Sequence, residues 1–148
     1  MSHHMRSRQF LRIAAALVAS ALVPALAVAI LSQSLRGGVF VFAIALGHAL
    51  VLGLPLFAIF WARGWVNLAS CTMMGFLVGA LPWSVVVSVP ILRGMTTWTN
   101  GMPMLVDGVP TPGGWINILW GLAFFGTFGA LAGLAFGLTF RWWPGTSG

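Results

Sequence analysis

Charged side chains are almost absent from this sequence of 148 residues. Seven are basic and one is acidic, so they make up 5% of the chain, whereas a soluble domain carries about a quarter. Apolar residues make up 59%, and the mean hydropathy is +1.00. A surface with so few charges cannot lie mainly in water. The composition therefore predicts an integral membrane protein.

The sequence has a single acid, Asp107, beside seven arginines and no lysine. A net charge of +6 would suggest nucleic-acid binding in a soluble protein. Here the arginines stand mostly singly at the ends of apolar segments, where membrane helices have their anchors. We therefore expect no nucleic-acid partner. Because no apolar segment holds a carboxylate, ion-coupled transport and a Ser-His-acid hydrolase are also disfavoured, and we do not expect an enzyme.

Cys71 is the only cysteine, which excludes an intrachain disulfide and a CxxC redox pair. Lysine, glutamate and tyrosine are absent beside abundant alanine, glycine, tryptophan and arginine, a bias that is typical of GC-rich bacterial genomes. We therefore expect a multi-pass protein of the bacterial inner (plasma) membrane, in contact with membrane lipid.

Four long apolar segments lie between the arginines and the turn residues. At a rise of 1.5 Å per residue, each is long enough to cross about 30 Å of hydrocarbon. The sequence therefore predicts an all-α protein, a bundle of four transmembrane helices in one domain over residues 1–148. The predicted spans are residues 13–31, 38–62, 66–92 and 115–140.

The distribution of arginines predicts the orientation. With a cytoplasmic N-terminus, only Arg36 and Arg93 lie outside, and the remaining five lie inside, as the positive-inside rule favours. Those five are Arg6, Arg8, Arg12, Arg63 and Arg141. Both termini are therefore expected in the cytoplasm.

Small residues form a face on the fourth segment. Steps of three and four residues place them on one side of a helix, where they permit close contact with another helix. The third segment carries a similar pair, with Ser84 and Ser88 on its opposite side. The contact lies either within the chain or with a second copy, so we expect a homo-oligomer or another membrane protein as partner. The packing glycines are Gly75, Gly79, Gly126, Gly129, Gly133 and Gly137.

The third connection, residues 94–114, is long enough to be more than a link. Asn100-Gly101 and Asp107-Gly108 are typical of turns, and residues 104–106 are expected to form one arm of a hairpin. The loop is either a lid over the outer end of the bundle or a recognition surface that includes Trp98, Asn100 and Asp107. Met102 and Met104 are a weak Cu(I) candidate, because methionine is also an ordinary filler of apolar gaps. We expect no bound metal or cofactor.

His48 is the one ionisable side chain near the middle of an apolar segment. Counting residues places it about 15 Å deep, at the level of Ser20 and Thr127. Such a group is by default a candidate for function. The structural alternative is a satisfied imidazole, bonded to the carbonyl of Ser20 that Pro24 leaves without a donor and to a hydroxyl.

Two functions therefore follow from the sequence. The favoured one is a non-enzymatic accessory module that binds partners through the glycine face and the outer loop, with His48 as a structural strut. The alternative is a small uncoupled channel or carrier for neutral or apolar solutes, in which His48, Ser20 and Thr127 line a site at the midplane.

Overall fold

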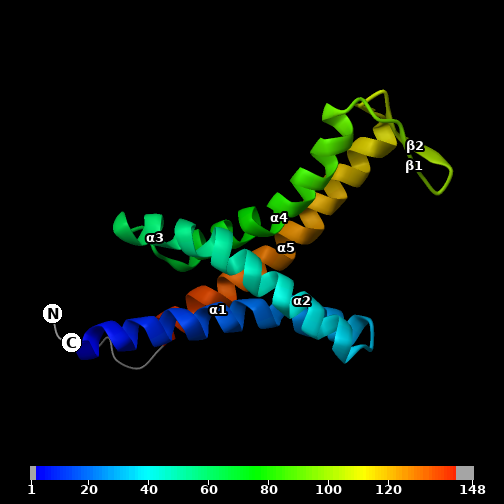
Figure 1. Ribbon diagram of the computed structural model, residues 1–148. Coiled ribbons are helices and arrows are strands. Elements are labelled where there is room, and N and C mark those ends of the chain that lie inside the picture. The colour runs from blue at the N-terminus through cyan, green and yellow to red at the C-terminus, as the bar shows by residue number, and fades with distance from the viewer. Residues whose placement is uncertain (1–2, 143–148) are drawn as a thin grey trace.

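The computed structural model of the protein describes residues 3–142, and most of them are helical (Figure 1). A short π-helical turn, η1, interrupts the second long helix, and a small sheet separates the last two. The elements are α1 His3–Leu31, α2 Leu35–His48, η1 Ala49–Gly53, α3 Leu54–Ala62, α4 Leu68–Leu92, β1 Thr97–Thr99, β2 Met102–Val106, β3 Val109–Pro110 and α5 Pro112–Trp142.

The prediction of four helices of membrane-spanning length is confirmed for the described chain. Each stretch is long and apolar enough to cross a membrane, and α2, η1 and α3 together form the second. The spans cover Gln9–Leu31, Leu35–Ala62, Leu68–Leu92 and Pro112–Arg141. They agree with the predicted segments to within a few residues at each end.

Local sequence explains where the helices begin and end. The Ser34 hydroxyl accepts a hydrogen bond from the Gly37 N–H and so caps the start of α2. At the start of α4, Asn67 and Ser70 bond each other's backbone N–H in a capping box. Gly94 follows α4 with a φ of 62°, a left-handed conformation that glycine adopts without strain.

Pro55 explains the π-helical turn in the middle of the second span. A proline lacks an N–H, and its ring clashes with the carbonyl four residues earlier, here that of Val51. The turn before it is widened, so the Leu54 N–H bonds the Ala49 carbonyl five residues back. By contrast, the prolines within α1 and α4 leave those helices continuous.

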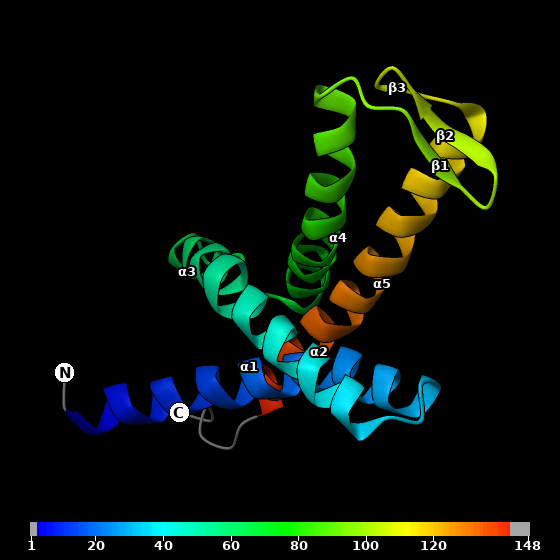
Figure 2. The same cartoon turned by 45° about the vertical axis from the view of Figure 1, so that its right-hand side comes forward.

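The helices form two antiparallel hairpins, α1 with α2 and α4 with α5 (Figure 1). They meet where α5 packs on α1, and α2 approaches the second hairpin mainly through η1 and α3. Beyond that contact, α4 and α5 extend away from the first hairpin and carry the sheet at their far end (Figure 2). The bundle is therefore open on one side.

The contact between α4 and α5 is built on glycine. A Cβ at Gly75 would lie 2.8 Å from Gly133 Cα, and one at Gly79 would lie 2.8 Å from Gly129 Cα. No side chain fits between the backbones at these positions. The two outlying glycines also face α4: Gly126 meets the ring of Phe76, and Gly137 meets Leu68 and Cys71. The partner of the predicted glycine face is thus α4 of the same chain.

Buried side chains gather where α1, α3, α4 and α5 converge. Phe57 of α3 lies at their centre, with its ring 5.0 Å from that of Phe136 and 5.3 Å from that of Phe140. The buried members of this cluster are Ala16, Leu17, Phe57, Cys71, Met74 and Phe136. The cluster joins the two hairpins at the end opposite the sheet.

The third connection forms a three-stranded antiparallel sheet in the order β1-β2-β3. Asn100 and Gly101 have φ of 49° and 77°, and Asp107 and Gly108 have the same values. Two residues with positive φ between paired strands form a type I′ turn, for which Asn-Gly and Asp-Gly are the preferred sequences. Both predicted turns are therefore confirmed, and β2 contains the predicted hairpin arm over residues 104–106.

Replacing Gly133 tests the backbone contact between α4 and α5. In Gly133→Ala the new methyl group would overlap the Cys71 carbonyl oxygen and lie 3.0 Å from Gly75 Cα. We expect the free energy of unfolding in detergent micelles to fall by about 1–3 kcal/mol. Gly47→Ala is the matched control, because a Cβ there meets nothing within 4 Å and should stabilise its helix slightly. Equal unfolding free energies for the two variants would contradict the contact.

Candidate functional site

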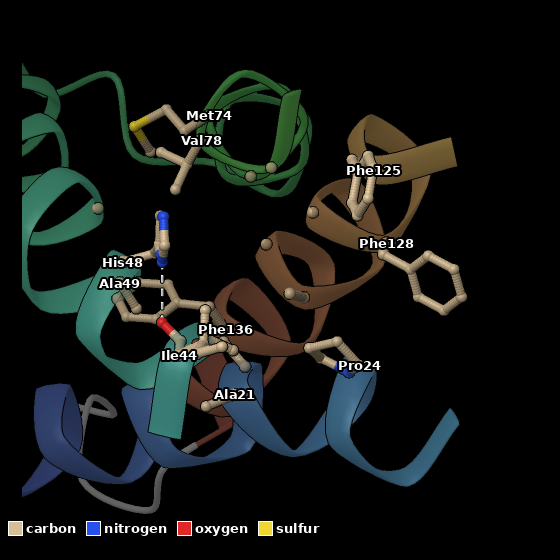
Figure 3. A pocket seen from close by; sticks show the side chains of 18 of the residues that line it. Ala21, Pro24, Ile44, His48, Ala49, Met74, Val78, Phe125, Phe128 and Phe136 are labelled. Carbon is tan, nitrogen blue, oxygen red and sulfur yellow. Dashed lines mark hydrogen bonds between the residues drawn. The ribbon is translucent and has the colours of Figure 1, made fainter. Parts of the chain in front are cut away.

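A cavity of about 420 Å³ lies between the two hairpins, and all four spans contribute to its wall (Figure 3). Its volume is in the range of small-molecule sites, about 300–1,000 Å³. It exists because α4 and α5 separate from the first hairpin beyond the buried cluster, while Phe57 and Phe136 line it at the closed end. The cavity is the candidate site.

The wall of the cavity is almost entirely apolar. Phe125, Phe128 and Phe136 line it from α5, and Met74 and Val78 line it from α4. The first hairpin adds small and aliphatic side chains, of which Ala21, Pro24, Ile44 and Ala49 are labelled in Figure 3. Such a wall excludes water and favours an apolar occupant.

Three side chains with a hydroxyl, thiol or imidazole group reach the wall, and two of them are buried among local contacts. The Ser20 hydroxyl is buried and donates to the Leu17 carbonyl of its own helix at 2.8 Å. The Cys71 side chain is 2% exposed and packs against Gly137. His48 is the third, and it differs from the other two because it is partly exposed.

His48 is held by its own helix and not, as the sequence suggested, by the carbonyl of Ser20. Its Nδ1 lies 2.9 Å from the Ile44 carbonyl oxygen, one turn earlier in α2. A carbonyl only accepts, so Nδ1 carries the proton of this bond and a neutral ring keeps its lone pair on Nε2. Figure 3 shows that second nitrogen turned away from Ile44 and toward Met74 and Val78 of α4.

Thr127 does not belong to the site, which corrects the sequence-based expectation. It is exposed, whereas Gly129 of the same helix lines the cavity. Two residues correspond to about 200° around an α-helix, so Thr127 faces away from the wall that Gly129 helps to form. Counting residues along a segment predicts the level of a side chain but not its direction around the helix. The structure thus brings together His48 and Ser20 from the predicted set, without Thr127.

The three predicted recognition residues lie on the sheet at the other end of the molecule. Trp98 of β1 is 64% exposed, and Asn100 is exposed in the first turn. Asp107 is exposed in the second turn, where its N–H donates to the Thr96 hydroxyl at 3.1 Å. Asp107 therefore helps to close a turn, and the three residues do not form a single cluster with the cavity.

The weak copper candidates also lie on the sheet. Met102 is 62% exposed and Met104 is partly buried two residues along the same strand, so both side chains are on one face. Among the described side chains, those of residues 9–141, no group of three His, Cys, Asp or Glu is placed to hold a metal ion. Cys71 is buried near the opposite end of α4, so the structure does not bring it to the two methionines.

The sequence did not reveal the aromatic wall of the cavity. The signal that could have indicated it is the spacing of Phe125 and Phe128, three residues apart on one side of α5. Phenylalanine faces lipid as readily as it lines a hydrophobic site, so this spacing alone does not distinguish a lipid-facing surface from a cavity wall.

Comparison with known proteins gives no match to a family model, a curated protein or a solved structure.

A substitution at Thr127 tests its exclusion from the site. In Thr127→Val the hydroxyl is lost at an exposed position outside the cavity wall, so we expect an unchanged free energy of unfolding, within about 0.5 kcal/mol. Unfolding should be followed in the same detergent as for the wild type. A loss of 1 kcal/mol or more would show that this hydroxyl makes a buried contact.

Proposed function

We propose that this chain is a multi-pass membrane protein that binds a neutral, apolar solute between its two helical hairpins. The cavity carries this proposal: it has the volume of a ligand site, and four helices of spanning length line it. Its wall offers hydrophobic contact together with one unengaged imidazole nitrogen. Sites for small ligands have this composition, a mainly apolar wall with few polar groups.

The chemistry of the wall favours an apolar solute over an ion or a sugar. Ion pathways need rings of carbonyls or charged side chains, and the only acidic side chain of the sequence, Asp107, is in the turn between β2 and β3. Sugars would need several hydrogen-bonding partners, since a buried hydroxyl without one costs free energy. A solute that already partitions into lipid could enter sideways through the open side of the bundle. The function is then binding or uncoupled carriage of such a solute.

The arrangement of the ends supports the proposed topology. α1 begins and α5 ends on the same side of the molecule, away from the sheet (Figures 1 and 2). With the arginine bias of the sequence, this favours an inner membrane with both termini in the cytoplasm and the sheet outside.

A second candidate is an accessory module that binds a protein partner through the sheet. Two surfaces were expected for this function, the glycine face and the loop, but the glycine face of α5 is covered by α4 in the same chain. The sheet remains, and it presents Trp98 with the apolar side chains of Met102 and Val109, all strongly exposed. Tryptophan is enriched at the energetic centres of interfaces, which is why this candidate is kept. Homo-oligomerisation stays a prediction.

Cysteine labelling tests the topology. Asn100→Cys lies in the exposed first turn of the sheet, and Ala62→Cys lies at the exposed end of α3. A maleimide that cannot cross membranes should label the first variant in intact cells and the second only after permeabilisation. Wild type is the control, because its Cys71 is buried. Labelling of both variants in intact cells would refute the proposed orientation.

Filling the cavity tests the binding function. Ala132 lines the cavity on α5, and Ala45 lines it on the opposite hairpin. In Ala132→Trp and, separately, Ala45→Phe, the added ring would occupy the site. We expect each to lower the retention of an apolar probe, deuterated 1-hexadecanol, at least five-fold in lipid nanodiscs. Retention is measured by mass spectrometry, as the excess over partitioning into empty nanodiscs.

The matched control for this experiment is Leu131→Trp, which adds a ring at an exposed neighbour of Ala132 outside the wall. It should retain the probe like wild type. The two cavity-filling substitutions lie on different helices, so misfolding of one variant would not by itself explain a loss of retention in both. Wild-type retention no higher than in empty nanodiscs would refute the binding function.

A further inference from the structure

One polar atom in the cavity has a hydrogen-bonding capacity that the surrounding wall does not meet. The Nδ1 atom of His48 is fixed by the Ile44 carbonyl, which turns Nε2 toward α4 (Figure 3). Among the described side chains of residues 9–141, this is the one hydrogen bond of the ring. An acceptor in an apolar environment without a donor costs about 1–3 kcal/mol. A ligand that brings a donor would remove that cost.

The side chains in front of Nε2 cannot act as donors. Met74 and Val78 lie opposite the ring on α4, and neither a thioether nor an aliphatic group carries a polar hydrogen. The hydroxyl of Ser20, across the cavity on α1, is already donated to Leu17. The Cys71 side chain is buried and packs against Gly137, one turn before Met74. The donor must therefore come from the occupant.

We propose that the occupant is a lipid-soluble alcohol, whose hydroxyl group donates to Nε2 of His48 while its hydrocarbon part fills the apolar cavity. This inference rests on the proposed binding function and names the class of its solute. The orientation follows from the wall: the hydroxyl lies at η1 and α4, and the chain runs along the phenylalanines of α5, toward the open side.

Other apolar molecules with a polar head match the site less well. A ketone or an ester offers only acceptors, which would face the lone pair of Nε2 without a shared hydrogen. A fatty acid is an anion at neutral pH and a fatty amine is a cation. Burying either charge needs a counter-charge, and the described wall has no carboxylate and no arginine. A hydroxyl group is neutral and brings the missing donor.

The experiment compares an alcohol with the alkane of the same length. Deuterated 1-hexadecanol and deuterated hexadecane are added separately to the full-length protein in lipid nanodiscs. Retention of each is measured by mass spectrometry as the excess over empty nanodiscs. We expect wild type to prefer the alcohol about 2- to 10-fold, the range that one net hydrogen bond supplies.

Two substitutions at His48 separate the hydrogen bond from packing. In His48→Phe the ring remains but the acceptor is lost, so the preference should fall to about one while the alkane is still retained. In His48→Gln the side-chain carbonyl offers an acceptor again, so part of the preference should return. Leu131→Trp, outside the wall, should keep the wild-type preference.

Each outcome decides between the two proposals. Equal retention of alcohol and alkane by wild type would refute the alcohol inference and leave the binding function standing. If His48→Phe still preferred the alcohol, the hydroxyl of the alcohol would be bound by a group other than His48, and the inference would also be overturned. Retention of neither probe would remove the binding function and the inference together.

Discussion

The close contact between the backbones of α4 and α5 is the constraint on which the rest of the structure depends. Gly75 and Gly79 lie against Gly133 and Gly129 with no room for a Cβ between them. In lipid, helices gain little from hydrophobic burial, so close packing of this kind is a main source of association. This contact holds α4 and α5 together as one hairpin and leaves no part of the glycine face of α5 free for the first hairpin. The first hairpin must therefore be held by other contacts.

The first hairpin is held where α5 packs on α1 and where a buried cluster forms around Phe57. Phe57 of α3 packs edge-on against Phe136 of α5, with Cys71 and Met74 of α4 in the same buried cluster. Because the cluster joins the hairpins near one end, they are free to diverge toward the other. The cavity follows from that divergence, and its apolar wall follows from spans that are apolar on nearly every side. The site is thus a product of how the hairpins join and needs no dedicated polar motif.

The spans, the turns and the glycine face could be predicted because each depends on residues close in sequence. Asn100-Gly101 defines its turn locally, and the spacing of Gly129 and Gly133 defines a face of one helix. The direction of Thr127 and the partner of His48 could not be predicted. Depth in a membrane follows from counting residues, but direction depends on how a helix is rotated against its neighbours. His48 bonds its own helix at Ile44, so the proline-freed carbonyl of Ser20 was the wrong partner.

A single acceptor in a large apolar cavity contributes selectivity more than affinity. Most of the binding free energy would come from hydrocarbon contact with the wall, which scales with buried area and hardly distinguishes one chain from another. The lone pair of Nε2 adds only the net value of one hydrogen bond when a donor is present. A ligand without a donor would remove solvent from the same lone pair and leave it unpaired, so the free-energy cost of desolvation would lower the affinity for that ligand. The bond from Nδ1 to Ile44 matters for this reason, because it fixes which nitrogen is turned toward Met74 and Val78 of α4.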